Sequence, residues 1–232
     1  MRVEQQPAFV LHARPYRETS MLVECLTRDY GRIGVVARGV RNERARMQRA
    51  QLEPFQRLAL DLLLKGELAT LRSAEPVGVP LRLTGDAGLA GLYLNELAVR
   101  LTGRQDPNPE LFGHYERTLQ RMAAGHPLAW TLRRFERDML DALGYALQLD
   151  VDAINGEPLD AAATYVYDPE SGVMPGRRGD PRALRGSDLL ALAADTATAP
   201  DQAGLAALRR MMRQVITFHL GGGELKAWRV LR

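Results

Sequence analysis

The chain has 232 residues, of which 46% are hydrophobic and 25% charged, a composition typical of a soluble globular protein with one or two domains and unlike disordered or collagen-like chains. It has no apolar stretch of about 18 residues that could span a membrane, and its N-terminal segment lacks a signal-peptide core. The single cysteine, Cys25, excludes an intramolecular disulfide and a cysteine-rich zinc centre. We therefore expect a protein of the reducing cytoplasm.

Arginine supplies 29 of the 31 basic side chains. Its planar guanidinium group grips phosphate and stacks on bases, whereas lysine acts as a hydrated point charge; the base composition of the genome is an alternative cause of this bias. Residues 28–49 contain seven arginines and two acids, a net charge of +5, so the rest of the chain sums to −2. A basic segment in a nearly neutral protein indicates a polyanion ligand, and the alternative is a solvated helix face.

The first 80 residues have the pattern of a small β barrel. Segments rich in strand-forming residues predict strands at 8–14, 20–28, 33–37, 55–65 and 68–74. The second and third are joined by a tight turn over 29–32, in which Gly31 can take a positive φ. Residues 41–51 lack β-branched character and predict a loop or short helix. A connecting segment at this position suits a closed five-stranded barrel.

Beyond residue 83 the hydrophobic spacing becomes helical. Apolar residues four positions apart predict a helix that Asp86 caps and Gly103 ends, and Asn108 followed by Pro109 predicts the start of the next. The helix that begins there is predicted to end near 124, and further helices are predicted to span 127–143, 187–194 and 201–220. The polar segment 150–180 interrupts them, and within it residues 164–167 could form one strand.

Several stretches of the sequence, in order along the chain, resemble the bacterial RecO family of recombination mediators. These are AFVLHARPYRETS (8–20), GRIGVVARGVR (31–41), LYLNEL (92–97), LRRFE (132–136), LGY (143–145) and LGG (220–222). The resemblance implies an N-terminal OB barrel, a helical domain and, in many members, a four-cysteine zinc lobe inserted between helices. Here NGEP (155–158) occupies the lobe without any cysteine, so we expect a degenerate, metal-free lobe.

Pattern and resemblance together predict an α+β fold in four parts. A five-stranded OB barrel at 1–80 is followed by an all-α domain whose two parts, 81–149 and 183–232, flank the irregular insertion at 150–182.

An OB barrel holds single strands in a positive groove with a few stacking side chains. We expect phosphate contacts from the arginines near the first hairpin, the third strand and the basic segment, namely Arg14, Arg17, Arg32, Arg38, Arg41, Arg44, Arg46 and Arg49. Strand alternation places Arg32 and Arg38 on the side opposite Ile33. Tyr16 and Tyr30 are the stacking candidates; the alternative for both is packing or turn stabilisation.

A second candidate site lies in the helical part. Its members are Arg117, Arg121, Trp130, Arg133, Arg134 and Arg137. Arginines beside an apolar groove suit a short acidic peptide. The resemblance implies such a partner, the acidic C-terminal tail of single-strand binding protein, and puts Arg133 or Arg134 forward. The alternative is intrahelical pairing with Glu136, Asp138 and Asp141.

Catalysis is not indicated by the sequence. The four histidines are scattered, Cys25 lies in an apolar strand, and the glycine run at 221–223 follows a helix and lacks the lysine of a phosphate-binding loop. We expect no enzyme activity, no cofactor and no metal.

The resemblance implies a nucleoid-associated DNA repair protein. It would anneal complementary strands and assist recombinase loading, and its partners would be single- and double-stranded DNA, RecR and single-strand binding protein. One alternative is an OB-fold RNA-binding or ribosome-associated module, and another is a nuclease or ligase accessory enzyme.

Overall fold

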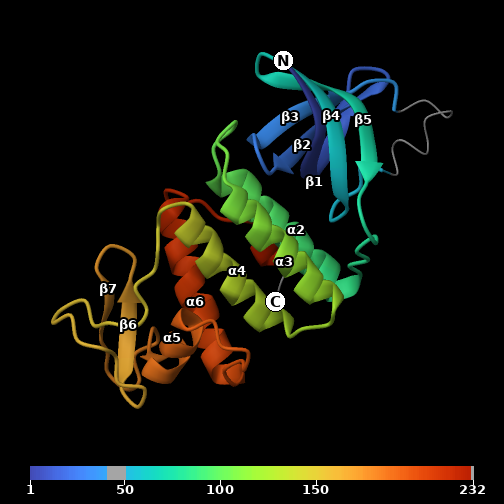
Figure 1. Ribbon diagram of the computed structural model, residues 1–232. Helices are drawn as coiled ribbons and strands as arrows, with labels where there is room; N and C mark the ends of the chain where they lie inside the picture. Colours follow the sequence, from blue (N-terminus) through green and yellow to red (C-terminus); the bar gives the residue numbers. More distant parts are fainter. Residues whose placement is uncertain (41–50, 231–232) are drawn as a thin grey trace. The chain divides into compact units, whose positions relative to one another are not determined.

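The computed structural model describes residues 1–40 and 51–230 (Figure 1). They form two compact units, which are described separately below. The first unit comprises Met1–Ala124 and the C-terminal segment that begins at Leu225, and the second comprises Gly125–Glu224. The predicted boundaries follow changes of secondary-structure type, whereas the compact units group the first two helices with the barrel.

Five strands close into a barrel in the first unit, as the sequence predicts. They are β1 (Arg2–Tyr16), β2 (Ser20–Thr27), β3 (Gly31–Ala37), β4 (Arg57–Lys65) and β5 (Leu68–Pro76). Their order around the barrel is β1-β2-β3-β5-β4. The β3–β5 pair is parallel and the other pairs are antiparallel. This topology confirms the predicted OB-type barrel, although β1 begins six residues earlier than the pattern of apolar residues indicates.

Gly31 in the turn between β2 and β3 is required for two reasons. Its φ is +63°, a conformation that side-chain-bearing residues rarely adopt. In addition, a Cβ atom at this position would lie 2.0 Å from the carbonyl oxygen of Asp106. The close approach allows the segment after the first helix to lie beside the start of β3, where Gln105 N–H donates to the Arg32 carbonyl at 2.9 Å.

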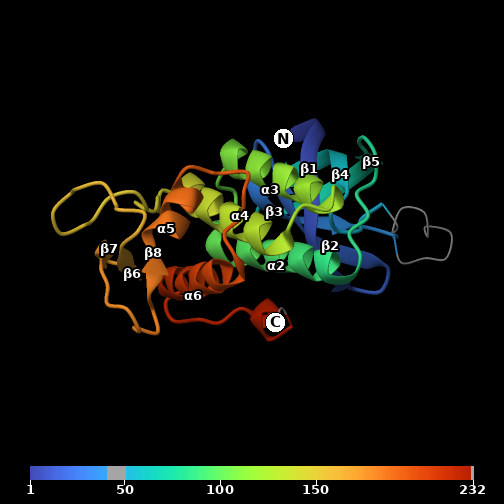
Figure 2. The same ribbon diagram turned by 90° about the horizontal axis from the view of Figure 1, so that it is seen from below.

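Two helices complete the first unit and lie side by side, α2 (Gly85–Leu101) and α3 (Pro109–Ala123) (Figures 1 and 2). The predicted cap of α3 is confirmed, because Asn108 Oδ1 accepts from Leu111 N–H at 2.9 Å. The predicted cap of α2 is wrong. The N-cap is Thr84, and Asp86 lies inside the first turn, where a carboxylate favours the helix through the helix dipole.

The helix α2 is attached to the barrel and to the C-terminal segment by two neighbouring side chains. The buried Asn95 donates to the carbonyl of Leu11 in β1 at 2.9 Å and accepts from the Tyr115 hydroxyl at 2.5 Å. Glu96 accepts from the backbone N–H groups of Lys226 and Ala227, both at 2.8 Å. These bonds hold the short 3₁₀ helix η2 (Lys226–Arg229) against α2 and give the LYLNEL stretch a structural role.

The second unit contains α4 (Leu128–Ala142), α5 (Gly186–Ala193) and α6 (Gln202–His219), together with a small sheet. The strands of the sheet are β6 (Thr164–Asp168), β7 (Gly172–Pro175) and β8 (Leu184–Arg185), in the order β7-β6-β8. The sequence predicts only the first of them, because β7 and β8 are too short for a period to be visible.

The insertion folds around an apolar core and local hydrogen bonds. Tyr165, Tyr167 and Val173 of its sheet belong to the same buried cluster as residues of α4 and α6. In the preceding loop the buried Asp152 accepts from Ile154 N–H through its carboxylate at 2.8 Å. Its backbone also bonds to residues 156 and 157.

Candidate nucleic-acid interface

A β-bulge in β1 interrupts the pairing of the first hairpin. Val10 pairs with Cys25, and His12 pairs with Glu24, so two steps along β1 correspond to one step along β2. Leu11 is therefore the extra residue. A bulge of this kind reverses which face the following side chains occupy.

The burial along β1 shows this reversal. Before the bulge, Ala8 and Val10 belong to the barrel core, whereas after it the alternate residue Ala13 packs against that core. His12 and Arg14 are exposed. Without the bulge Arg14 would continue the inward series, so the bulge makes this arginine available to a ligand.

The register of the first three strands brings two candidate regions to one end of the barrel. Tyr16 pairs with Ser20 across the hairpin, and Met21 pairs with Ala37 on the other side of β2. Arg38, which follows Ala37, therefore lies at the same end as the hairpin tip.

This hairpin end carries exposed positive charge. Arg14, Arg17 and Arg38 are exposed, and Tyr16 is half-buried. The guanidinium carbon of Arg17 lies 5.2 Å from the centroid of the Tyr16 ring, which is a cation–π distance. A base that stacks on Tyr16 would share the ring with this guanidinium group or replace it.

Half of the predicted DNA-contacting arginines cannot be placed on the barrel. Arg41, Arg44, Arg46 and Arg49 lie outside the described residues. The chain enters that segment just after Arg38.

Arg32 has a structural environment that its charge did not indicate. Its guanidinium pairs with Glu24, and it donates to the side-chain and backbone oxygens of Thr102 at 3.1 and 2.8 Å. Its side chain is only 12% exposed. It also lies about 20 Å along β3 from Arg38, at about 3.3 Å per residue. We therefore leave Arg32 out of the DNA-contacting set proposed below.

Tyr30 lies in the turn between β2 and β3, away from the hairpin end. It packs against the barrel core, and its backbone N–H donates to Thr27 Oγ1 at 3.2 Å. These contacts correspond to packing and turn stabilisation, the alternative to base stacking for Tyr30. Of the two stacking candidates, Tyr16 is the one that lies at the basic end.

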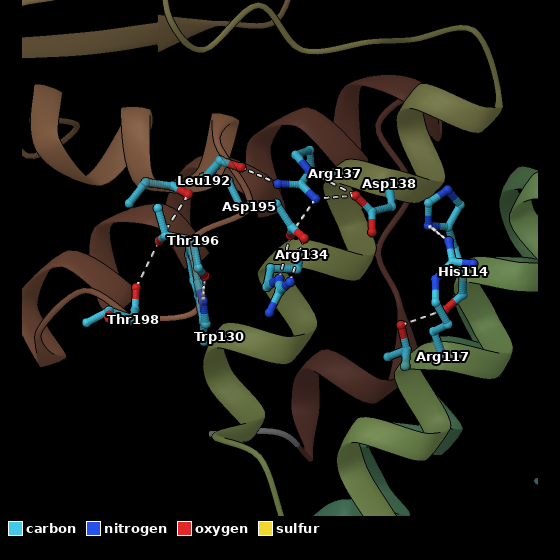
Figure 3. Close-up of polar contacts among 12 residues, drawn as sticks. His114, Arg117, Trp130, Arg134, Arg137, Asp138, Leu192, Asp195, Thr196 and Thr198 are labelled. Atoms are coloured by element: carbon cyan, nitrogen blue, oxygen red, sulfur yellow. Dashed lines mark hydrogen bonds and ion pairs between the residues drawn. The ribbon is translucent and has the colours of Figure 1, made fainter.

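The arginines of α4 converge on acids (Figure 3). Arg134 contacts both carboxylate oxygens of Asp195 at 2.5 Å, and Arg137 contacts Asp195 at 2.7 Å and Asp138 at 2.5 Å. Arg133 pairs with Glu136 one turn away, and both side chains are almost fully buried. The intrahelical alternative thus holds for Arg133 and Arg137, and Asp195 is a partner that the helix pattern could not indicate.

Asp195 is held by charge and by its loop. Partial burial acts to raise its pKa, but hydrogen bonds from Arg134 and Arg137 outweigh this effect and lower the pKa to about 2. The indole N–H of the buried Trp130 donates to the Thr196 carbonyl at 3.0 Å, so the loop after α5 is fixed to α4. The α4 arginines are therefore already bound to a carboxylate supplied by the chain itself.

The remaining members of the predicted partner site belong to the first unit. Arg117 and Arg121 lie on α3, where Arg117 is exposed and contacts the His114 ring at 3.0 Å. These two arginines and those of α4 belong to different compact units, so each group is described by itself.

Sequence reasoning missed several residues that organise these surfaces. Glu24 pairs with Arg32 and with Arg104, and Asp195 pairs with Arg134. Each lies far in sequence from at least one partner, so no local pattern identifies it. Asn95 stands in a quoted family stretch, but nothing local indicates that it would bond to a bulge.

Metal ligands are not clustered in the part of the chain that the structure describes: no three His, Cys, Asp or Glu side chains are placed to hold an ion. Burial, and secondarily the neighbouring Glu24, raise the pKa of Cys25 to about 12, which makes it an inert thiol in the barrel core. Over the same residues, no helix has the length and hydrophobicity needed to cross a bilayer.

A closed five-stranded barrel in the order β1-β2-β3-β5-β4, followed by helices, defines a protein with an OB-type barrel and a helical domain. Comparison with known sequences narrows this class. The family model described as Recombination protein O N terminal matches residues 1–80, and the one described as Recombination protein O C terminal matches residues 82–229.

Full-length relatives agree with this assignment. The chain is 50% identical over 235 residues to the DNA repair protein RecO of Stenotrophomonas maltophilia (strain R551-3), with 100% of this chain and 97% of the relative covered. It is 46% identical over 236 residues to the protein of that name from Xanthomonas euvesicatoria pv. vesicatoria (strain 85-10), with the same coverage. The chain belongs to the RecO family, and its role lies in DNA repair.

Proposed function

We propose that the protein is a non-catalytic, DNA-binding recombination mediator. It would anneal complementary single strands and, together with RecR, assist recombinase loading on strands coated with single-strand binding protein. The observation that carries the DNA-binding part is the exposed basic end of the barrel, where Arg14, Arg17 and Arg38 accompany Tyr16.

The physical basis of annealing is charge neutralisation. Two single strands repel each other through their phosphates, and arginines that replace condensed counterions reduce this repulsion. If about five arginines contact phosphates, the log–log salt slope on single-stranded DNA is near −3.5, from about −0.7 per contact. Raising the salt from 50 to 200 mM would then weaken binding about 100-fold.

The test is charge reversal at Arg38, which lies at the basic end, and at Arg41, which the sequence predicts to contact phosphate. Arg38→Glu combined with Arg41→Glu is expected to lower the affinity for all single-stranded DNA sequences about equally and to slow annealing of strands pre-coated with single-strand binding protein. Arg210→Glu, an exposed position on α6, carries the same type of charge change as a control. A salt slope close to zero for the wild-type protein would overturn the proposal. Equal-length RNA serves as the comparison, because a clear preference for RNA would favour the ribosome-associated alternative.

The proposed contact with single-strand binding protein rests on α4. Arg134 and Arg137 form a paired cation site that already binds a carboxylate, and the acidic tail would exchange its own carboxylate for that of Asp195. RecR is included among the partners because of the family resemblance, and no residue is assigned to its contact.

Peptide titration distinguishes this contact from a merely structural ion pair. Arg134→Ala is expected to weaken binding of the tail peptide, whereas Asp195→Ala is expected to strengthen it because the internal competitor is removed. Arg133 is a poor choice for truncation, because leaving the buried Glu136 carboxylate without its partner costs about 3–5 kcal/mol. Unchanged peptide affinity in the Arg134→Ala variant would count against this site.

A further inference from the structure

A surface pocket of about 180 Å³ lies on the outer face of the first three strands, beside the end of α2. It is lined by His12, Arg14, Leu22, Glu24, Arg32, Val99 and Arg104. All of these belong to the first compact unit, and only two of them were among the residues expected to contact DNA.

The pocket is built by two features already described. The bulge at Leu11 turns His12 and Arg14 outward from β1. On the opposite side, Arg32 forms an isolated bridge with Arg104 and donates to Thr102 at the end of α2. The residues that line the pocket are therefore held on a barrel strand and at a fixed helix end.

The charges in the pocket do not cancel. The two oxygens of Glu24 are divided between two arginines, with Oε1 paired to Arg32 and Oε2 to Arg104 at 2.9 Å. Glu24 is 11% exposed and Arg104 is 47% exposed. Among the described residues Arg14 makes no ion pair. Three guanidinium groups around one carboxylate leave a net charge of +2.

This arrangement suits a bound anion. Glu24 holds Arg104 in one position, so less side-chain entropy is lost when Arg104 contacts a ligand. The half-exposed guanidinium of Arg104 and the exposed one of Arg14 offer charge-assisted donors to phosphate oxygens. Leu22 and Val99 provide apolar surface beside them.

We propose that this pocket seats one phosphodiester group of a bound nucleic-acid strand, with Arg14 and Arg104 as its principal contacts. The proposal rests on the DNA binding proposed above and extends it. It adds Arg104 as a contact residue and directs the strand across the outer face of β1–β3 toward the hairpin end.

The experiment measures single-stranded DNA affinity as a function of salt for the full chain. Arg104→Ala is expected to reduce the magnitude of the log–log slope by about 0.7, the value for one lost phosphate contact. The drop in affinity between 50 and 200 mM salt then becomes about 2.6-fold smaller. Arg104→Lys, which keeps the charge, is expected to retain the slope. Arg100→Ala, at an exposed position near the end of α2 and outside the pocket lining, is the matched control.

The outcomes separate the pocket from the proposed function. If Arg104→Ala and Arg100→Ala have the same slope as the wild type, the pocket proposal is wrong while DNA binding stands. A wild-type slope near zero would refute the DNA binding itself. A second arm uses inorganic phosphate and thermal unfolding. If phosphate stabilises the wild type but not Arg104→Ala, while the DNA slope of the variant is unchanged, the pocket binds free phosphate and the phosphodiester proposal fails.

Discussion

The hydrogen bonds of Asn95 make a quantitative prediction about what holds α2 on the barrel. Asn95 is 3% exposed; it donates to the carbonyl of the bulge residue Leu11 and accepts from the Tyr115 hydroxyl. Replacing Asn95 with alanine removes both bonds. A buried carbonyl deprived of its donor costs about 1–3 kcal/mol, and the lost bond from the hydroxyl about 1 kcal/mol.

We therefore expect Asn95→Ala to lower the free energy of unfolding of the first unit by about 2–4 kcal/mol. This is a large part of the 5–15 kcal/mol typical of domains. Tyr115→Phe removes the shared bond but leaves the bond from Asn95 to the Leu11 carbonyl in place, so it should cost less. The double variant should lose less than the sum of the two single losses, because both single changes remove that bond.

The assay follows the first unit specifically. Cys25, the single cysteine of the chain, is buried in the barrel, so its alkylation across a urea series reports when the barrel opens. Gln120→Ala, at an exposed position of α3, is the control and should change the unfolding free energy by no more than about 0.5 kcal/mol. A loss below this value for Asn95→Ala, or strict additivity of the two changes, would refute the reasoning.

Three other outcomes follow from the described geometry. Gly31→Ala should destabilise the barrel more than Gly66→Ala in urea unfolding. Both positions have positive φ, but of the two only Gly31 would place a Cβ against a backbone oxygen, that of Asp106. Equal losses of stability would argue against the close approach. The pKa of Cys25 is raised to about 12 from 9.0. Its reaction with iodoacetamide at pH 8 should therefore be at least about 1,000-fold slower in the native protein than after unfolding. Comparable rates would show that the thiol is accessible. The lowered pKa of Asp195 stabilises the fold above its unfolded value of 3.8, and this contribution is lost as the pH falls through about 2. The unfolding free energies of wild type and Asp195→Asn should therefore differ by about 1 kcal/mol at pH 5 and converge near pH 2, and a constant difference would contradict the assignment.

The barrel could be predicted because its signals are local. Strand-forming residues and the turn at Gly31 mark the second and third strands, and the observed pairing of Met21 with Ala37 follows from that turn. The start of β1 was missed because residues 2–7 are mostly polar and end in a proline. The bulge at Leu11 was missed for a different reason: the apolar run before it gives no sign of where one residue is left unpaired.

The charged residues show where local reasoning stops. Sequence identifies an arginine, but its role depends on whether an acid lies beside it in the fold. Arg134 and Asp195 are 61 positions apart, and Arg104 and Glu24 are 80 apart. Intrahelical pairing was a local alternative, and it holds for Arg133 with Glu136.

Whether an arginine is paired with an acid in the fold affects how the protein can bind a polyanion. An arginine held by a carboxylate contributes less to phosphate binding, since the ligand must replace or share an existing partner. Counting positive charges along residues 28–49 therefore overstates the contribution of Arg32 and says nothing about Arg14, which lies outside that segment. Arg14 faces solvent because β1 carries an extra residue at Leu11. A chain of the same charge without that bulge would direct Arg14 toward the barrel core, where a charge is unfavourable. Strand register, held in place by Asn95, thus decides as much about the ligand surface as net charge does.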